Sequence, residues 1–155
     1  MLINKNKRKV VLVIAGHRGG RLPYALLALA ANLDDDVLLL DNPDSKLLKK
    51  HTNEIKYAIC VGISTITGTY IQHSLTAAKA IRSINPHVPF VWGGWHPSLK
   101  PEQTLENEYV DKVIVGQGEQ AFSDLVKKIK NGEKTNDIIS YDYMDRNSFP
   151  VYGFD

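Results

Sequence analysis

Five short apolar runs recur along the chain, and polar or glycine-rich stretches separate them. Val, Ile and Leu dominate the runs, and hydrophobic residues continue through each run instead of alternating with polar ones. This pattern is typical of strands buried on both faces of a parallel sheet. The predicted strands are Lys9–Ala15, Val37–Leu40, Tyr57–Ile63, Val88–Trp92 and Asp111–Val115.

Apolar residues at helical spacing fill the intervals between these runs. The longest predicted helix covers Thr69–Ile84, and Asn85-Pro86 ends it. The other predicted helices are Pro23–Leu33, a short one from Asp44 or Ser45 to His51, Pro101–Asn107, and one around Phe122–Ile129. Strand and helix thus alternate five times, which predicts a doubly wound α/β fold. We expect a five-stranded parallel sheet of order 2-1-3-4-5, with helices on both faces.

Four of the predicted strands end in glycine or hydroxyl residues, at 16–20, 64–67, 93–94 and 116–118. Ligands of such sheets bind beyond the carboxyl ends of the strands. Glycine lets a backbone approach a ligand closely, because no Cβ intervenes. The four breaks therefore predict a large, flat or long ligand across this edge. The alternative for Thr67 and Thr69 is that their hydroxyls cap the following helix.

Composition narrows the classes of function. The 155 residues are 43% apolar and carry a net charge of +2, as expected for one soluble domain. Basic residues at 5–9 indicate a solvated tail, and we expect no nucleic-acid partner. Cys60 is the single cysteine, which excludes a disulfide or a cysteine-ligated cluster within the chain. No apolar run is long enough to span a membrane and no signal peptide is recognisable, so we expect a cytoplasmic protein.

Several candidate residues have two interpretations. His17 is a metal ligand or a polar loop residue, and His96 lines a ligand or orders its own loop. Glu119 contacts a ligand or meets the positive end of a helix dipole. The glycines after the first strand lack the spacing of a dinucleotide loop. Because Arg18 and Arg21 could meet a phosphate, a nucleotide or flavin site and a ligand-free interaction domain remain alternatives.

Three stretches carry a resemblance to a known family. They are Val91-Trp92-Gly93-Gly94-Trp95-His96-Pro97-Ser98, Pro101-Glu102-Gln103-Thr104-Leu105 and Asp111-Lys112-Val113-Ile114-Val115-Gly116-Gln117-Gly118-Glu119. Together they resemble the cobalamin-binding domain of cobalamin-dependent radical S-adenosylmethionine (SAM) enzymes, over about residues 9–130. The family usually has Gly-Glu-Gly-Glu where this chain has Gln117 in the second position.

The resemblance implies a flavodoxin-like domain over residues 1–131 that binds cobalamin in its base-off form. The corrin would lie on the loop after the first strand, and the displaced base would pass between strands one and three. The residues implied in cofactor binding are Gly16, His17, Arg18, Gly20, Leu22, Pro23, Tyr24, Ser64, Thr65, Ile66, Thr67, Gly93, Gly94, Trp95, His96, Gly116, Gln117, Gly118 and Glu119.

His17 aligns with the histidine that binds cobalt in related methyltransferase and mutase domains. Their motif is Asp-x-His-x-x-Gly, and here Ala15 stands in place of the aspartate. A carboxylate in that position orients the histidine and raises its basicity. The resemblance therefore implies His17 as the candidate lower ligand of cobalt, without its usual orienting partner.

The radical chemistry of the family needs a three-cysteine cluster motif, which one cysteine cannot supply. The resemblance thus implies a module that is not catalytic alone, with the iron–sulfur cluster and SAM in a partner domain in cis or in trans. Residues 132–155 would be the linker toward that domain, with no membrane or nucleic acid involved.

Overall fold

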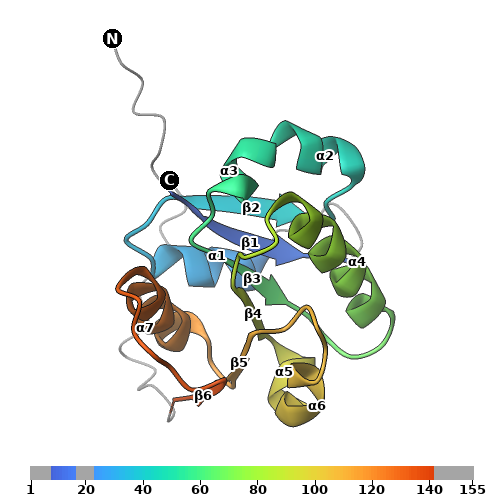
Figure 1. Cartoon of the computed structure of the whole chain (residues 1–155). Helices are drawn as coiled ribbons and strands as arrows, with labels where there is room; N and C mark the ends of the chain where they lie inside the picture. Colours follow the sequence, from blue (N-terminus) through green and yellow to red (C-terminus); the bar gives the residue numbers. More distant parts are fainter. Residues whose placement is uncertain (1–7, 17–22, 142–155) are drawn as a thin grey trace.

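In the computed structural model the chain forms a six-stranded parallel sheet with helices on both faces (Figure 1). The structure describes residues 8–16 and 23–141. The strands are β1 (Val10–Ile14), β2 (Val37–Asp41), β3 (Cys60–Ser64), β4 (Phe90–Gly93), β5 (Lys112–Val115) and β6 (Ile138–Ser140). The helices are α1 (Tyr24–Ala31), α2 (Ser45–Lys50), α3 (Thr52–Lys56), α4 (Thr69–Ile84), α5 (Trp95–Leu99), α6 (Pro101–Leu105) and α7 (Glu119–Lys130).

The strand order is β2-β1-β3-β4-β5-β6, so the predicted order 2-1-3-4-5 is confirmed. The predicted count of five strands is wrong, because β6 pairs in parallel with β5 at the edge of the sheet. β6 is only three residues long and its two isoleucines are half-buried. It falls within residues 132–155, for which the sequence predicts a linker.

Two hydrophobic clusters lie on opposite faces of the sheet. On one face Val11 and Val13 pack with α2, α3 and α4, and on the other Val10 and Leu12 pack with α1 and α7. Figure 1 shows the same division of the helices. The side chains of a strand alternate between faces, so a continuous apolar run supplies both clusters. The predicted burial on both faces is thus confirmed for β1 and β3. β2 lies at the edge of the sheet, and only Leu40 of its five residues is fully buried.

Local interactions explain several helix and strand boundaries. The predicted bounds of α4 are confirmed, and Asp44 caps α2 by accepting a hydrogen bond of 2.7 Å from the Leu47 backbone N–H. The Asp111 carboxylate accepts hydrogen bonds from the Phe90 N–H (2.7 Å) and from Arg82 (3.1 Å), which ties the start of β5 to β4 and α4. Helices α3 and α5 have only five residues each and were not predicted.

Within residues 8–16 and 23–141, none of the helices combines the length and the apolar character that crossing a bilayer requires.

Candidate functional site

The carboxyl ends of β1, β3 and β4 lie side by side. Ile14 is level with Ser64, and Ser64 is level with Gly93, because the three strands pair in register. Four glycines with positive φ follow strands β1, β3, β4 and β5 at this edge, namely Gly16 (+85°), Gly68 (+95°), Gly94 (+99°) and Gly116 (+81°). The edge predicted from the strand-end residues thus exists in the fold. We call it the carboxyl edge.

Thr65 joins the β3 loop to its neighbours. Its N–H donates to the Gly93 carbonyl (3.0 Å), and its carbonyl accepts from the His96 N–H (3.4 Å). Its hydroxyl accepts a hydrogen bond of 3.1 Å from the buried Ser74 hydroxyl of α4. Thr65 is only 3% exposed, so its side chain holds the loop together and does not face an open crevice.

Gly94 lies too close to the β3 loop for any side chain. A Cβ at this position would be 2.5 Å from the Thr65 carbonyl oxygen and 3.3 Å from the Ser64 hydroxyl. Its positive φ alone already favours glycine. In the Gly93-Gly94 pair, Gly94 thus has a clear structural role: it allows the β4 loop to pack closely on the β3 loop.

Ser98 makes the corresponding connection between the β4 and β5 loops. Its hydroxyl donates to the Gly94 carbonyl (2.7 Å) and accepts from the Gly116 N–H (2.9 Å). Thr65 and Ser98 therefore link the three loops into one hydrogen-bonded series. Sequence reasoning missed the role of Ser98, because a serine near the end of a short helix shows no sign of a partner 18 residues later.

The β1 loop is held from two sides. The Gly16 N–H donates to Asn42 Oδ1 (2.7 Å) beyond β2. On the other side the imidazole of His73, from α4, lies against Gly16, and a Cβ on Gly16 would be 2.7 Å from His73 Cδ2. His73 was not among the predicted site residues.

The turn after β5 is open to solvent. A Cβ added at Gly116 would meet no atom within 4 Å, and the same is true of Gly68 in the loop after β3. Gln117 is exposed, and Gly118 and Glu119 are half-buried at the start of α7. The predicted residues of this turn are thus accessible to a ligand, and both interpretations of Glu119 stay open.

Large apolar side chains are unusually exposed at the same edge. Trp95 (75%), Leu99 (66%) and Tyr24 (64%) are the three most exposed large hydrophobic residues in the described part of the chain, and Ile66 is 42% exposed. Each follows the carboxyl end of a strand by ten residues or fewer. Exposed apolar side chains that follow strand ends are candidates for contact with an apolar ligand.

Other predicted residues divide into three groups. Thr67 is exposed, and its capping alternative is wrong because Gly68 occupies the N-cap position of α4 with no side-chain cap. Pro23 and His96 are half-buried. His17, Arg18, Gly20 and Leu22 lie outside the described residues. The described ranges contain no group of three His, Cys, Asp or Glu side chains able to hold a metal ion.

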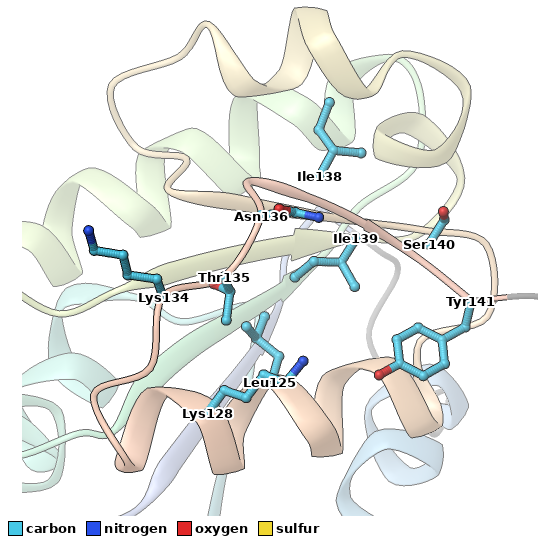
Figure 2. Close-up of a pocket in the computed structure, with 9 residues that line it drawn as sticks. All are labelled: Leu125, Lys128, Lys134, Thr135, Asn136, Ile138, Ile139, Ser140 and Tyr141. Carbon is cyan, nitrogen blue, oxygen red and sulfur yellow. The ribbon is translucent and has the colours of Figure 1, made fainter.

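A pocket of about 370 Å³ lies at a different place, between α7 and β6. Figure 2 shows that its lining comes from α7 and from the segment that runs through β6. Tyr141, at its end, donates a hydrogen bond of 2.9 Å to Asp124 of α7, and this bond raises the pKa of the phenol. None of the lining residues belongs to the predicted site.

Cys60 lies in β3 and is fully buried. Burial away from water raises the pKa of its thiol to about 12, so the group stays protonated and unreactive. The predicted inert thiol fits this environment.

Comparisons with known proteins agree with this geometry. The profile of the B12 binding domain family matches residues 9–126. An uncharacterised methyltransferase of Pyrococcus horikoshii is 30% identical over 141 residues, which cover 85% of this chain and 29% of that protein. The chain therefore spans less than a third of this curated relative.

Solved structures give the same fold. The radical SAM methyltransferase TsrM of Kitasatospora setae, with tryptophan and a SAM analogue bound, matches 83% of this chain and 27% of its own, at 25% identity and a TM-score of 0.72. A second TsrM structure, with cobalamin and a [4Fe–4S] cluster bound, matches at 24% identity with the same score. The apo cobalamin-dependent SAM radical enzyme OxsB matches 84% of this chain and 20% of its own, at 21% identity and a TM-score of 0.56.

Proposed function

The chain belongs to the B12 binding domain family, and we propose that it holds base-off cobalamin at the carboxyl edge of its sheet for a radical SAM domain. The family match covers residues 9–126, which include the carboxyl ends of β1 to β5. The observation that carries the location is the coincidence of open glycines with the three most exposed apolar side chains.

The residues at the carboxyl edge fit such a ligand. A corrin offers a broad apolar ring system with amide side chains at its rim. Exposed Ile66 and Trp95 supply apolar contact, and Gly116 leaves room for a close approach by the ligand. When bound, cobalamin supplies a cobalt ion that can carry a methyl group. The part of the chain's own residues is to bind and orient it.

The base-off form needs space for the displaced nucleotide tail. β1 and β3 pair along their whole length, up to Ile14 and Ser64, so a tail can pass between them only beyond these residues. On the α1–α7 face the space over Gly62 is filled, because a Cβ there would be 2.9 Å from Phe122 and 2.8 Å from Leu12. We therefore assign the tail to the loops at the edge, next to Ser64 and Gly93.

The second part of the proposal is a partner domain. This chain covers 29% of the Pyrococcus protein, which is named as a methyltransferase, and 27% of TsrM, which is a radical SAM methyltransferase. A chain with one cysteine cannot ligate a [4Fe–4S] cluster through three cysteines, so cluster and SAM would belong to the partner. The predicted module boundary at residue 131 would then move to the end of β6, which pairs with β5, and the connection to the partner would begin after Ser140.

Titration of the purified protein with hydroxocobalamin, followed by desalting and an absorption spectrum, tests this function. We expect about one equivalent to stay bound with a base-off spectrum. No retention would refute cobalamin binding, and retention with a base-on spectrum would refute only the tail position. A yellow, fluorescent protein after incubation with flavins would favour the flavin alternative.

Two matched variants test the location. Trp95→Ala removes exposed apolar surface at the carboxyl edge and should weaken retention. Tyr57→Ala removes another exposed aromatic ring (47%, against 75% for Trp95) just before β3, at the opposite end of the strand, and should leave retention unchanged. Equal effects of the two variants would contradict the location.

A further inference from the structure

We propose that His73 of α4 is a ligand-contacting residue of the carboxyl edge, which offers an imidazole nitrogen to the bound cobalamin. The inference rests on the proposed function. It concerns a residue outside the motifs that carry the family resemblance, on a helix whose role at the edge the sequence does not reveal. Its basis is the packing of the His73 ring against Gly16.

The contact with Gly16 places the His73 ring at the end of β1. The atoms nearest to a Cβ built on Gly16 are His73 Cδ2 at 2.7 Å and His73 Cβ and Cγ at 3.1 Å. Carbon atoms of the imidazole thus cover the glycine, and neither ring nitrogen is among the nearest atoms. Any side chain at position 16 would displace the ring. The absence of a side chain at Gly16 therefore leaves the space that the imidazole occupies.

The His73 ring packs against Gly16 and still remains open to solvent. The residue is exposed, although the next residue, Ser74, is completely buried on the core side of α4. The imidazole makes no hydrogen bond to any other residue in the ranges 8–16 and 23–141. By contrast, His51 contacts the Glu54 carboxylate at 3.2 Å. A histidine that packs against backbone, and whose nitrogens make no hydrogen bond within the described ranges, can offer them to a ligand.

His73 and the proposed ligand share one edge. Gly16 directly follows β1, and β1 ends level with Ser64 of β3. The imidazole at Gly16 is thus a neighbour of the strand ends to which we assign the corrin and its tail. An imidazole nitrogen can donate to or accept from an amide group, and it is also a good ligand for cobalt. Both the hydrogen bond and the coordination of cobalt would be made to the same bound cobalamin.

The placement can be tested without cobalamin. Gly16→Ala should lower the midpoint of thermal unfolding through backbone strain and the clash with His73. Adding His73→Ala should restore part of this loss, because the clash disappears. Gly116→Ala has a similar φ and no neighbour within 4 Å, so it measures the strain alone. Strict additivity of Gly16→Ala and His73→Ala would overturn the placement.

Ligand contact is then measured by the dissociation constant of hydroxocobalamin. His73→Ala should raise it about threefold to tenfold, the range for one hydrogen bond. The matched control is His87→Ala, which removes an exposed histidine that precedes β4 and lies at the amino ends of the strands. This variant should leave the dissociation constant unchanged. Unchanged binding in His73→Ala, while the wild type binds, would overturn this inference and leave the proposed function intact. Failure of the wild type to bind would overturn both.

The EPR spectrum of the bound Co(II) form distinguishes the two kinds of contact. Nitrogen hyperfine splitting that is lost in His73→Ala but kept in His17→Ala would place the imidazole on cobalt. A spectrum insensitive to His73→Ala, together with weaker binding that His73→Gln partly restores, would place it on an amide group of the corrin. Both results support ligand contact, and neither is expected from a residue that only stabilises α4.

Discussion

Gly94→Ala tests the packing that joins the β3 and β4 loops. The new Cβ would lie 2.5 Å from the Thr65 carbonyl oxygen and 3.1 Å from the Thr65 backbone nitrogen. These are backbone atoms that cannot rotate away. They are also fixed by their own hydrogen bonds to Gly93 and His96. The chain must therefore shift at the centre of the carboxyl edge to accept one methyl group.

The expected cost has two parts. Placing a non-glycine residue at φ +99° and ψ −167° costs about 1–3 kcal/mol. Forcing an extra methyl group into a packed site costs about 1–3 kcal/mol more. Gly68 provides the matched control, because it has almost the same backbone angles (φ +95°, ψ −144°) and no atom within 4 Å of its would-be Cβ. Gly68→Ala therefore carries the first cost without the second.

Thermal unfolding of the two variants separates these costs. We expect Gly94→Ala to be less stable than Gly68→Ala by about 2 kcal/mol. For a domain of this size that is a difference of about 4–8 °C in the unfolding midpoint. Equal midpoints would refute the close packing of Gly94 on Thr65, and with it the description of the loops as one connected unit.

Three further predictions concern single residues. Ser98→Ala removes the hydroxyl that accepts from the Gly116 N–H, so it should lower the free energy of unfolding by about 1 kcal/mol and speed exchange of the Gly116 amide hydrogen. An unchanged exchange rate would contradict this hydrogen bond. Burial raises the pKa of Cys60 to about 12, so the folded protein keeps a proton that the unfolded chain loses near pH 9. Stability should therefore fall as pH rises above about 9, and urea unfolding of Cys60→Ala should lack that component. Asp111→Ala removes the carboxylate that bonds Arg82 and should lower the free energy of unfolding, measured in urea, by about 1–2 kcal/mol. An unchanged free energy would show that the Arg82–Asp111 pair does not stabilise the fold.

The sequence was sufficient for the features that depend on local pattern. Continuous apolar runs predicted the first five strands and their order, and Asn85-Pro86 marked the end of α4. The buried face of α4 contains a polar pair that the spacing of apolar residues does not indicate. Ser74 is fully buried on it and donates a hydrogen bond to the Thr65 hydroxyl.

Features that depend on tertiary contact could not be predicted. β6 has three residues and exists because β5 offers an unpaired edge. The helix α5 begins at a Gly-Gly-Trp-His-Pro sequence that is typical of a loop. The contact between His73 and Gly16 spans 57 positions and leaves no periodic signal. At the candidate site the sequence thus indicated the strand ends correctly, but not the residues that hold them together.

Backbone amide hydrogen exchange with and without hydroxocobalamin shows where on the domain the cofactor binds. We expect cobalamin to slow exchange at the carboxyl edge, in the segments around Ser64–Thr67, Gly93–His96 and Gly116–Glu119. We expect no change in the pocket between α7 and β6, whose lining includes Lys128 and Ser140. Protection confined to that pocket, with the strand ends unchanged, would contradict the placement of the ligand.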